Sequence, residues 1–149
     1  MKIGIASDHG GFELKKVIVD FLKSLNYDVT DFGAATLDPK DDYPDFVIPL
    51  GKALAANEIE RGIAICGSGV GASIAANKIH GVRAALIHEM FSAHQGVEDD
   101  NMNMICLGGR VTGDEMAKEL IQKFLQSEFT GAERHQRRLN KVQELENAD

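Results

Sequence analysis

The chain has 149 residues, 44% of them hydrophobic, and its 16 Lys and Arg against 23 Asp and Glu leave a net charge of −7. This length suits one domain over residues 1–149, because a chain of this size buries about two thirds of its unfolded surface. With 15 Gly, 3 Pro and 2 Cys, the composition excludes a disulfide scaffold, a collagen-like chain and a disordered tail. The acidic charge also argues against nucleic acid and anionic membrane surfaces as partners.

Two features point to a cytoplasmic protein. No apolar run approaches the roughly 20 residues that a membrane span needs, and an apolar strand follows Met1-Lys2 without a signal-peptide core. Cys66 and Cys106 lie far apart and outside any Cys-x-x-Cys pair, so we expect free thiols in a reducing compartment.

Short apolar runs alternate with segments of helical period along the chain, which is typical of a parallel sheet with helices on both faces. We predict a doubly wound α/β domain whose ligands bind at the carboxyl ends of its strands. Its strands are predicted at 2–7, 28–32, 62–66, 82–87 and 103–107. Its helices are predicted at 14–25, 44–57, 70–78, 90–97, 114–126 and after Gly131, with a loop at 33–44.

The last predicted helix carries a narrow apolar stripe of Leu139, Val142 and Leu145 at three-residue spacing. This stripe comes after the sheet is complete, so we expect it to pack on another subunit.

Three polar clusters are expected at the binding edge of the sheet, at residues 7–11, 66–71 and 98–103. In the second cluster, Gly67, Gly69 and Gly71 precede a helix, whose free N–H groups attract an anion. Two other interpretations stay open at this point. The glycines could simply make the corner, or Gly67-x-Gly69-x-x-Ala72 with Glu89 after the next strand could bind a dinucleotide.

Cys66 ends a buried strand directly before this loop, where a helix N-terminus would stabilise a thiolate that acts as base or nucleophile. A small core residue is the alternative, and it is the interpretation we adopt for Cys106. Arg134 and Arg138 share a helix face and with Arg110 could clamp a phosphate, unless that helix is simply solvated. The spacing of His88-Glu89 and His94 does not fit a zinc motif, so we expect no metal.

Seven segments together resemble the family of ribose-5-phosphate isomerase B and the galactose-6-phosphate isomerase subunits. They follow one another in order along nearly the whole chain: Ser7-Asp8-His9-Gly10-Gly11, Asp42-Tyr43-Pro44, Ile65-Cys66-Gly67-Ser68-Gly69-Val70-Gly71, Ala75-Ala76-Asn77-Lys78, Gly81-Val82-Arg83-Ala84, Leu107-Gly108-Gly109-Arg110-Val111 and Arg134-His135-Gln136-x-Arg138.

The resemblance implies a Rossmann-like three-layer α/β/α sandwich with a five-stranded parallel sheet. It also implies a homodimer or homotetramer whose active sites are shared between subunits. From its apolar stripe, we expect the C-terminal helix at the subunit interface. The implied reaction is aldose–ketose isomerisation of a phosphorylated sugar without metal or nucleotide cofactor.

The resemblance also implies roles for individual residues. Cys66 matches the base that moves a proton between C1 and C2, and Ala72 stands where relatives with another base carry a glutamate. The loop with Ser68 matches the part that holds the enediolate. The matched substrate-binding positions are Asp8, His9, Gly67, Gly69, Val70, Gly71 and Arg110, with Arg134 and Arg138 on the phosphate.

One departure from the family pattern stands before the fifth strand, where Asp99-Asp100 replaces a His-Asn pair whose histidine opens the sugar ring. We count Asp99 with Cys66 and Ser68 as catalytic and Asp100 as substrate-binding. His94 or His9 could instead open the ring, or a four-carbon phosphate, which cannot close a furanose, could make ring opening unnecessary.

Our leading hypothesis is interconversion of ribose 5-phosphate and ribulose 5-phosphate. The alternatives are isomerisation of erythrulose 4-phosphate, allose 6-phosphate or galactose 6-phosphate, and a sugar-phosphate binding module without catalysis.

Overall fold

The computed structural model describes residues 1–148 and contains a 5-stranded parallel sheet in the order β2-β1-β3-β5-β4. The strands are β1 (Lys2–Ser7), β2 (Asp28–Asp31), β3 (Arg61–Cys66), β4 (Ala84–Leu86) and β5 (Met104–Gly108). The helices are η1 (His9–Gly11), α1 (Phe12–Ser24), α2 (Pro44–Ala55), α3 (Val70–Ala76), α4 (Met90–Asp100), α5 (Asp114–Gln126) and α6 (Glu133–Glu146).

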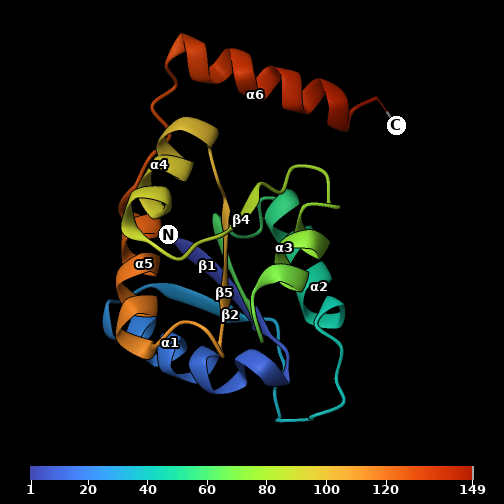
Figure 1. Cartoon of the computed structure of the whole chain (residues 1–149), viewed down its shortest axis with the longest axis vertical. Coiled ribbons are helices and arrows are strands. Elements are labelled where there is room, and N and C mark those ends of the chain that lie inside the picture. The colour runs from blue at the N-terminus through green and yellow to red at the C-terminus, as the bar shows by residue number, and fades with distance from the viewer. Residues whose placement is uncertain (149) are drawn as a thin grey trace.

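Helices cover both faces of the sheet, with α1, α4 and α5 on one face and α2 and α3 on the other (Figure 1). The predicted three-layer α/β/α sandwich of Rossmann type is therefore confirmed. The predicted elements are all present, with differences at their ends. The largest are a shorter β4 and a longer α4, which runs past its predicted end at residue 97 to Asp100.

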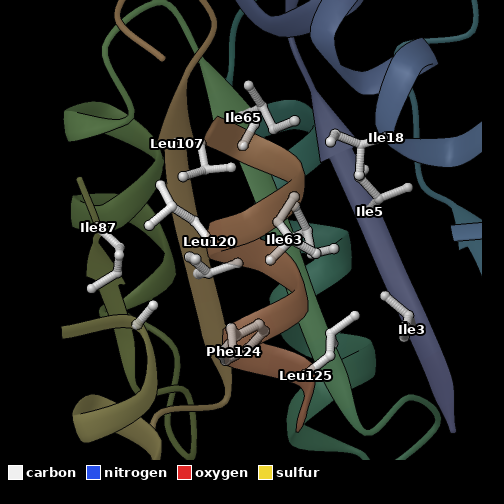
Figure 2. Packing of buried hydrophobic residues seen from close by; sticks show 14 of the residues in the cluster. Ile3, Ile5, Ile18, Ile63, Ile65, Ile87, Leu107, Leu120, Phe124 and Leu125 are labelled. Carbon is white, nitrogen blue, oxygen red and sulfur yellow. The ribbon is translucent and has the colours of Figure 1, made fainter. Parts of the chain in front are cut away.

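The two faces of the sheet differ in the size of their side chains, because successive residues of a strand point to opposite faces. Large aliphatic residues face α1 and α5, among them Ile5, Ile63 and Leu107 (Figure 2). Apart from Met104, small residues such as Ala6, Ala64 and Cys106 face α2 and α3. At Gly4, an added Cβ would lie 2.6 Å from Leu50 Cδ1, so only glycine lets α2 pack this closely.

The order of the strands places a crevice between β1 and β3. The chain passes from β1 to β2 on one side and then returns to place β3 on the other side. In doubly wound sheets, ligands bind at such a switch point, outside the carboxyl ends of the strands. Because every pair of strands is parallel, the carboxyl ends of β1, β3 and β5 share one edge.

Helix α6 lies across one end of the molecule, beside the C-terminal end of α4 (Figure 1). Its buried residue is His135, whereas Val142 is 58% and Leu145 is 75% exposed. The predicted apolar stripe is thus present and largely uncovered in this chain. None of the helices in residues 1–148 combines the length and apolar character needed to cross a membrane.

Candidate active site

A cleft of about 370 Å³ opens at the carboxyl ends of β1, β3 and β5, the edge at which the sequence predicts a site. Its walls come from the ends of these strands and from the segment before α2. The residues that line it are Asp8, Tyr43, Cys66, Gly67, Ser68, Gly71, Arg110 and Val111.

Glycines let the loops of this edge approach one another closely. An added Cβ at Gly10, in η1, would lie 2.7 Å from the backbone nitrogen of Gly67. Gly69 has a φ of 81°, in the left-handed region that favours glycine, and is the N-cap residue directly before α3. The N–H of Gly109 donates to the carbonyl of Cys66 at 2.8 Å, and this bond ties the loop after β5 to the end of β3.

Cys66 is the last residue of β3 and lines the cleft, although it is only 4% exposed. The backbone N–H of Gly69 donates a hydrogen bond to its Sγ over 3.2 Å. Such a bond strengthens when its acceptor becomes negatively charged. Cys66 therefore combines the two interpretations left open by the sequence, since it packs against the core and also faces the site.

Cys106 is a core residue, as predicted. It lies on β5 opposite Ala64 of β3 and is 0% exposed. Burial, with a smaller effect of the neighbouring Cys66, raises the pKa of its thiol to about 12. At neutral pH, Cys106 is therefore a protonated thiol away from solvent, and it cannot serve as a base.

Asp8 and His9 follow β1, and Asp8 lines the cleft. Asp8 is 6% exposed, and its Oδ1 accepts a hydrogen bond from the N–H of Gly10 at 2.9 Å. Asp41 reaches His9 from the segment before α2, with 2.6 Å between its Oδ1 and His9 Nδ1. This bond, supported by the charge of Asp8, raises the pKa of His9, although partial burial opposes the shift.

The same three side chains also have the spacing of a metal site, since their ligand atoms lie within 4.8 Å of one another. Oδ1 of Asp41 and Oδ1 of Asp8 already accept hydrogen bonds, whereas Asp41 Oδ2 has no hydrogen-bond partner among residues 1–148. Asp41 Oδ1 binds both the ring and the backbone N–H of His9, and Asp8 Oδ1 binds Gly10. In this structure the three side chains form a hydrogen-bond network directly after β1.

Arg110 and Tyr43 complete the walls. The guanidinium of Arg110 covers Gly67, where an added Cβ would meet its Nε and Nη1 at 3.8 Å. Tyr43 packs on Gly71, with its Cζ 2.6 Å from the position of an added Cβ. Tyr43 and Val111 were not predicted as site residues, although both stand in segments that carry the family resemblance.

The expectation that residues 98–103 lie at the cleft is wrong. They precede β5, and in a parallel sheet the residues before a strand lie at the amino edge. There the carbonyl of Asn103 accepts a hydrogen bond from the N–H of Gly62 at 2.9 Å. Gly62 and Cys66 are four residues apart on β3, so the two edges are separated by about 13 Å, at ~3.3 Å per residue.

Asp99 lies at this opposite edge, in contact with α6. Its Oδ1 is 3.2 Å from Nε2 of the buried His135, and its Oδ2 accepts a hydrogen bond from Gln95 at 2.9 Å. Asp100, Arg134 and Arg138 are exposed at the same end of the molecule. The structure thus brings Cys66, Ser68, Asp8 and Arg110 together at the cleft. It places Asp99, Asp100, Arg134 and Arg138 at the opposite edge of the sheet.

Glu89 offers no support for dinucleotide binding. It caps α4, and both of its carboxylate oxygens accept the N–H of Ser92, at 3.0 and 3.1 Å. These bonds lower the pKa of Glu89 and hold its carboxylate at the helix terminus, so it is already paired within the chain.

Comparison with known proteins identifies close relatives of the whole chain. The sequence matches the Ribose/Galactose Isomerase family over residues 3–142. It is 38% identical to ribose-5-phosphate isomerase B of Escherichia coli, over 97% of this chain and 96% of that protein. It is also 38% identical to D-erythrulose-4-phosphate isomerase of Pectobacterium atrosepticum, over 88% of this chain and 86% of that protein.

A solved structure agrees over the same extent. Ribose-5-phosphate isomerase B of Mycoplasma genitalium with bound ribulose-5-phosphate superposes with a TM-score of 0.94. It is 40% identical in sequence, and the match covers 99% of this chain and 97% of that chain.

The different surroundings of the cysteines predict different reactivity. We expect iodoacetamide at about pH 8 to alkylate Cys66, which faces the cleft, and to spare Cys106, whose burial keeps the thiol protonated. Peptide mapping by mass spectrometry measures both sites, and the protein unfolded in urea is the control in which both should react. Faster modification of Cys106 than of Cys66 in the folded protein would contradict this assignment.

Proposed function

The chain belongs to the ribose/galactose isomerase family, and we propose that it interconverts ribose 5-phosphate and ribulose 5-phosphate. It is an aldose–ketose isomerase, and its substrate is a phosphorylated sugar. The observation that carries the proposal is the position of Cys66, at the glycine-rich loop and on the wall of the cleft.

In the proposed mechanism, the Cys66 thiolate removes the proton on C2 of the open-chain aldose. The electron pair moves into the C1–C2 bond and the carbonyl oxygen becomes the enediolate oxygen. Cys66 then returns its proton to C1, while a proton passes from the oxygen on C2 to the oxygen on C1. We assign this second transfer to the hydroxyl of Ser68, which also lines the cleft.

The enediolate is the high-energy species, so the catalyst must stabilise its negative charge. Preorganised N–H donors typically contribute on the order of 3 kcal/mol each to such stabilisation. In the proposal, the loop of Gly67, Gly69, Val70 and Gly71 holds the enediolate. The N–H groups of Gly67 and Gly71 are its donors, because those of Gly69 and Val70 already donate to Cys66 Sγ and Ser68 Oγ. Close backbone packing at Gly10 and Gly109 supports the rigidity that this role requires.

The phosphate group requires further positive charge, and the cleft of one chain holds Arg110, whose charge also acts on the neighbouring His9. We propose that a second copy of the chain brings Asp100, Arg134 and Arg138 to this cleft, with α6 at the interface. The exposure of apolar side chains supports this arrangement. Leu145 of α6 is 75% exposed, and Ile74 of α3, next to the cleft, is 57% exposed.

A second candidate substrate is erythrulose 4-phosphate. The pairing of Asp99 with His135 and Gln95 favours it, because a carboxylate bound on both oxygens is poorly placed to open a sugar ring. A tetrose 4-phosphate needs no ring opening, since the hydroxyl that would close a furanose carries the phosphate. The relative from Pectobacterium atrosepticum is named for this substrate.

Replacing the proposed base tests the mechanism. We expect Cys66→Ala to lower kcat by about a thousandfold, because proton transfer by a positioned group typically contributes factors of about 10² to 10⁴. Binding of ribulose 5-phosphate, measured by calorimetry, should change little. Cys106→Ala is the matched control and should keep its kcat. A Cys66→Ala protein with undiminished kcat would refute the mechanism.

Mixing two inactive variants tests the shared site. Cys66→Ala damages the cleft and Arg138→Ala damages α6, so a mixed dimer has one site with both changes and one intact site. Refolding equal amounts together should restore about a quarter of the wild-type activity, because half of the dimers are mixed. Activity equal to the mean of the two variants alone would show that each site lies within one chain.

Substrate length separates the two candidates. We expect kcat/KM on ribose 5-phosphate to exceed that on erythrulose 4-phosphate and on allose or galactose 6-phosphate, as measured with purified protein. A higher value on the four-carbon phosphate would replace the leading proposal with the second. If none of these sugars is turned over but they bind, the chain is a sugar-phosphate binding module.

A further inference from the structure

Asp41 makes two hydrogen bonds to His9 across 32 residues of sequence. Its Oδ1 accepts the backbone N–H of His9 at 3.0 Å and pairs with the ring Nδ1 at 2.6 Å. Two bonds from one residue to the backbone and ring of another fix both the position and the orientation of that ring. Neither bond has a part in the proton transfer proposed for Cys66.

Asp41 is also an unusually buried carboxylate. Its side chain is 9% exposed, and its Oδ2 is buried without a hydrogen-bond partner among residues 1–148. A buried carboxylate costs free energy unless an opposite charge or hydrogen bonds compensate it. His9 can supply this positive charge, because its imidazole pairs with Asp41. The Asp41–His9 pair is therefore most stable when the imidazole is protonated.

We propose that Asp41 is a positioning residue that fixes the ring of His9. Nδ1 of the ring is paired with Asp41, so Nε2 remains available to bind the anionic part of the substrate. The proposal rests on the sugar-phosphate isomerase activity proposed above. It assigns to Asp41 an action through His9 and not a contact with the reacting carbons.

The charges around His9 support this role. Asp41 and Asp8 raise the pKa of His9, while partial burial and the charge of Arg110 lower it, and the net shift is upward. A larger share of His9 is therefore protonated near neutral pH than of a free histidine. Together with Arg110 on the wall of the cleft, it presents two cations to a phosphate or an enediolate.

The same contact ties down a wall of the cleft. Asp41 belongs to the segment between β2 and α2, and Tyr43, two residues later, packs on Gly71 at the start of α3. The segment is thus held at η1 through His9 and at α3 through Tyr43. Loss of the Asp41 contact would loosen the first of these attachments.

Asp41→Asn tests the proposal, because an asparagine oxygen can still accept the His9 N–H while the negative charge is lost. NMR titration of the His9 ring should give a pKa above the ordinary value of 6.5 in the wild type and a lower one in the variant. Asp45→Asn, an exposed position on α2, is the matched control and should leave the His9 titration unchanged. A His9 pKa that is equal in Asp41→Asn and wild type overturns the proposal.

Kinetics give the second measurement. Near pH 7.5, Asp41→Asn should raise KM for the sugar phosphate about tenfold with kcat within about twofold, as expected for loss of charge-assisted binding. The difference should shrink toward about pH 5.5, where His9 is protonated in both proteins. A fall in kcat alone, or a KM effect independent of pH, overturns the proposal.

A readout without turnover separates this proposal from the proposed function. Inorganic phosphate should shift the NMR signals of the His9 ring in the wild type, and about tenfold more phosphate should be needed in Asp41→Asn. If no sugar phosphate is turned over, the proposed function fails while this titration still decides the role of Asp41. Equal phosphate dependence in both proteins overturns that role.

Discussion

The cleft depends on one constraint, the close packing of backbone on backbone where β1, β3 and β5 end. Gly10 lies against Gly67, and Gly108 lies against Ser68, each at a distance that leaves no room for a Cβ. Because no side chains intervene, the loops after β3 and β5 bond directly to each other, as in the 2.8 Å bond from Gly109 to the carbonyl of Cys66. This packing holds the sulfur of Cys66 beside the N–H of Gly69 with little freedom to move.

The charged residues predicted for the site lie in two groups at opposite edges of the sheet. Asp8 and Arg110 line the cleft with Cys66, whereas Arg134 and Arg138 lie on α6 at the other end. Within one chain, the two groups cannot act on one small molecule. The proposed dimer resolves this separation, because a second copy can bring its amino edge to the cleft of the first while the exposed apolar stripe of α6 becomes buried.

The structure brings together at one cleft those predicted site residues that directly follow a strand. Residues after β1 and β3 share an edge in any parallel sheet, so the spacing of apolar runs was enough to group Asp8 and Cys66, whereas Arg110 was grouped with Arg134 and Arg138 as a possible phosphate clamp. The sequence prediction was wrong for residues 98–103, which precede β5 and therefore lie at the amino edge. Asp99 was assigned from a family motif, and its neighbours His135 and Gln95 emerge only when α4 and α6 are in place.

By itself, the sequence determined the layers, the identity of the cleft edge and the core position of Cys106, because these follow from local periodicity and from the alternation of side chains along a strand. The tertiary structure alone decided which polar groups pair. The contact of Asp41 with His9 joins residues 32 apart, and no periodic pattern encodes it. Such contacts depend on how a loop returns over the sheet, and the burial that makes them strong exists only in the folded chain.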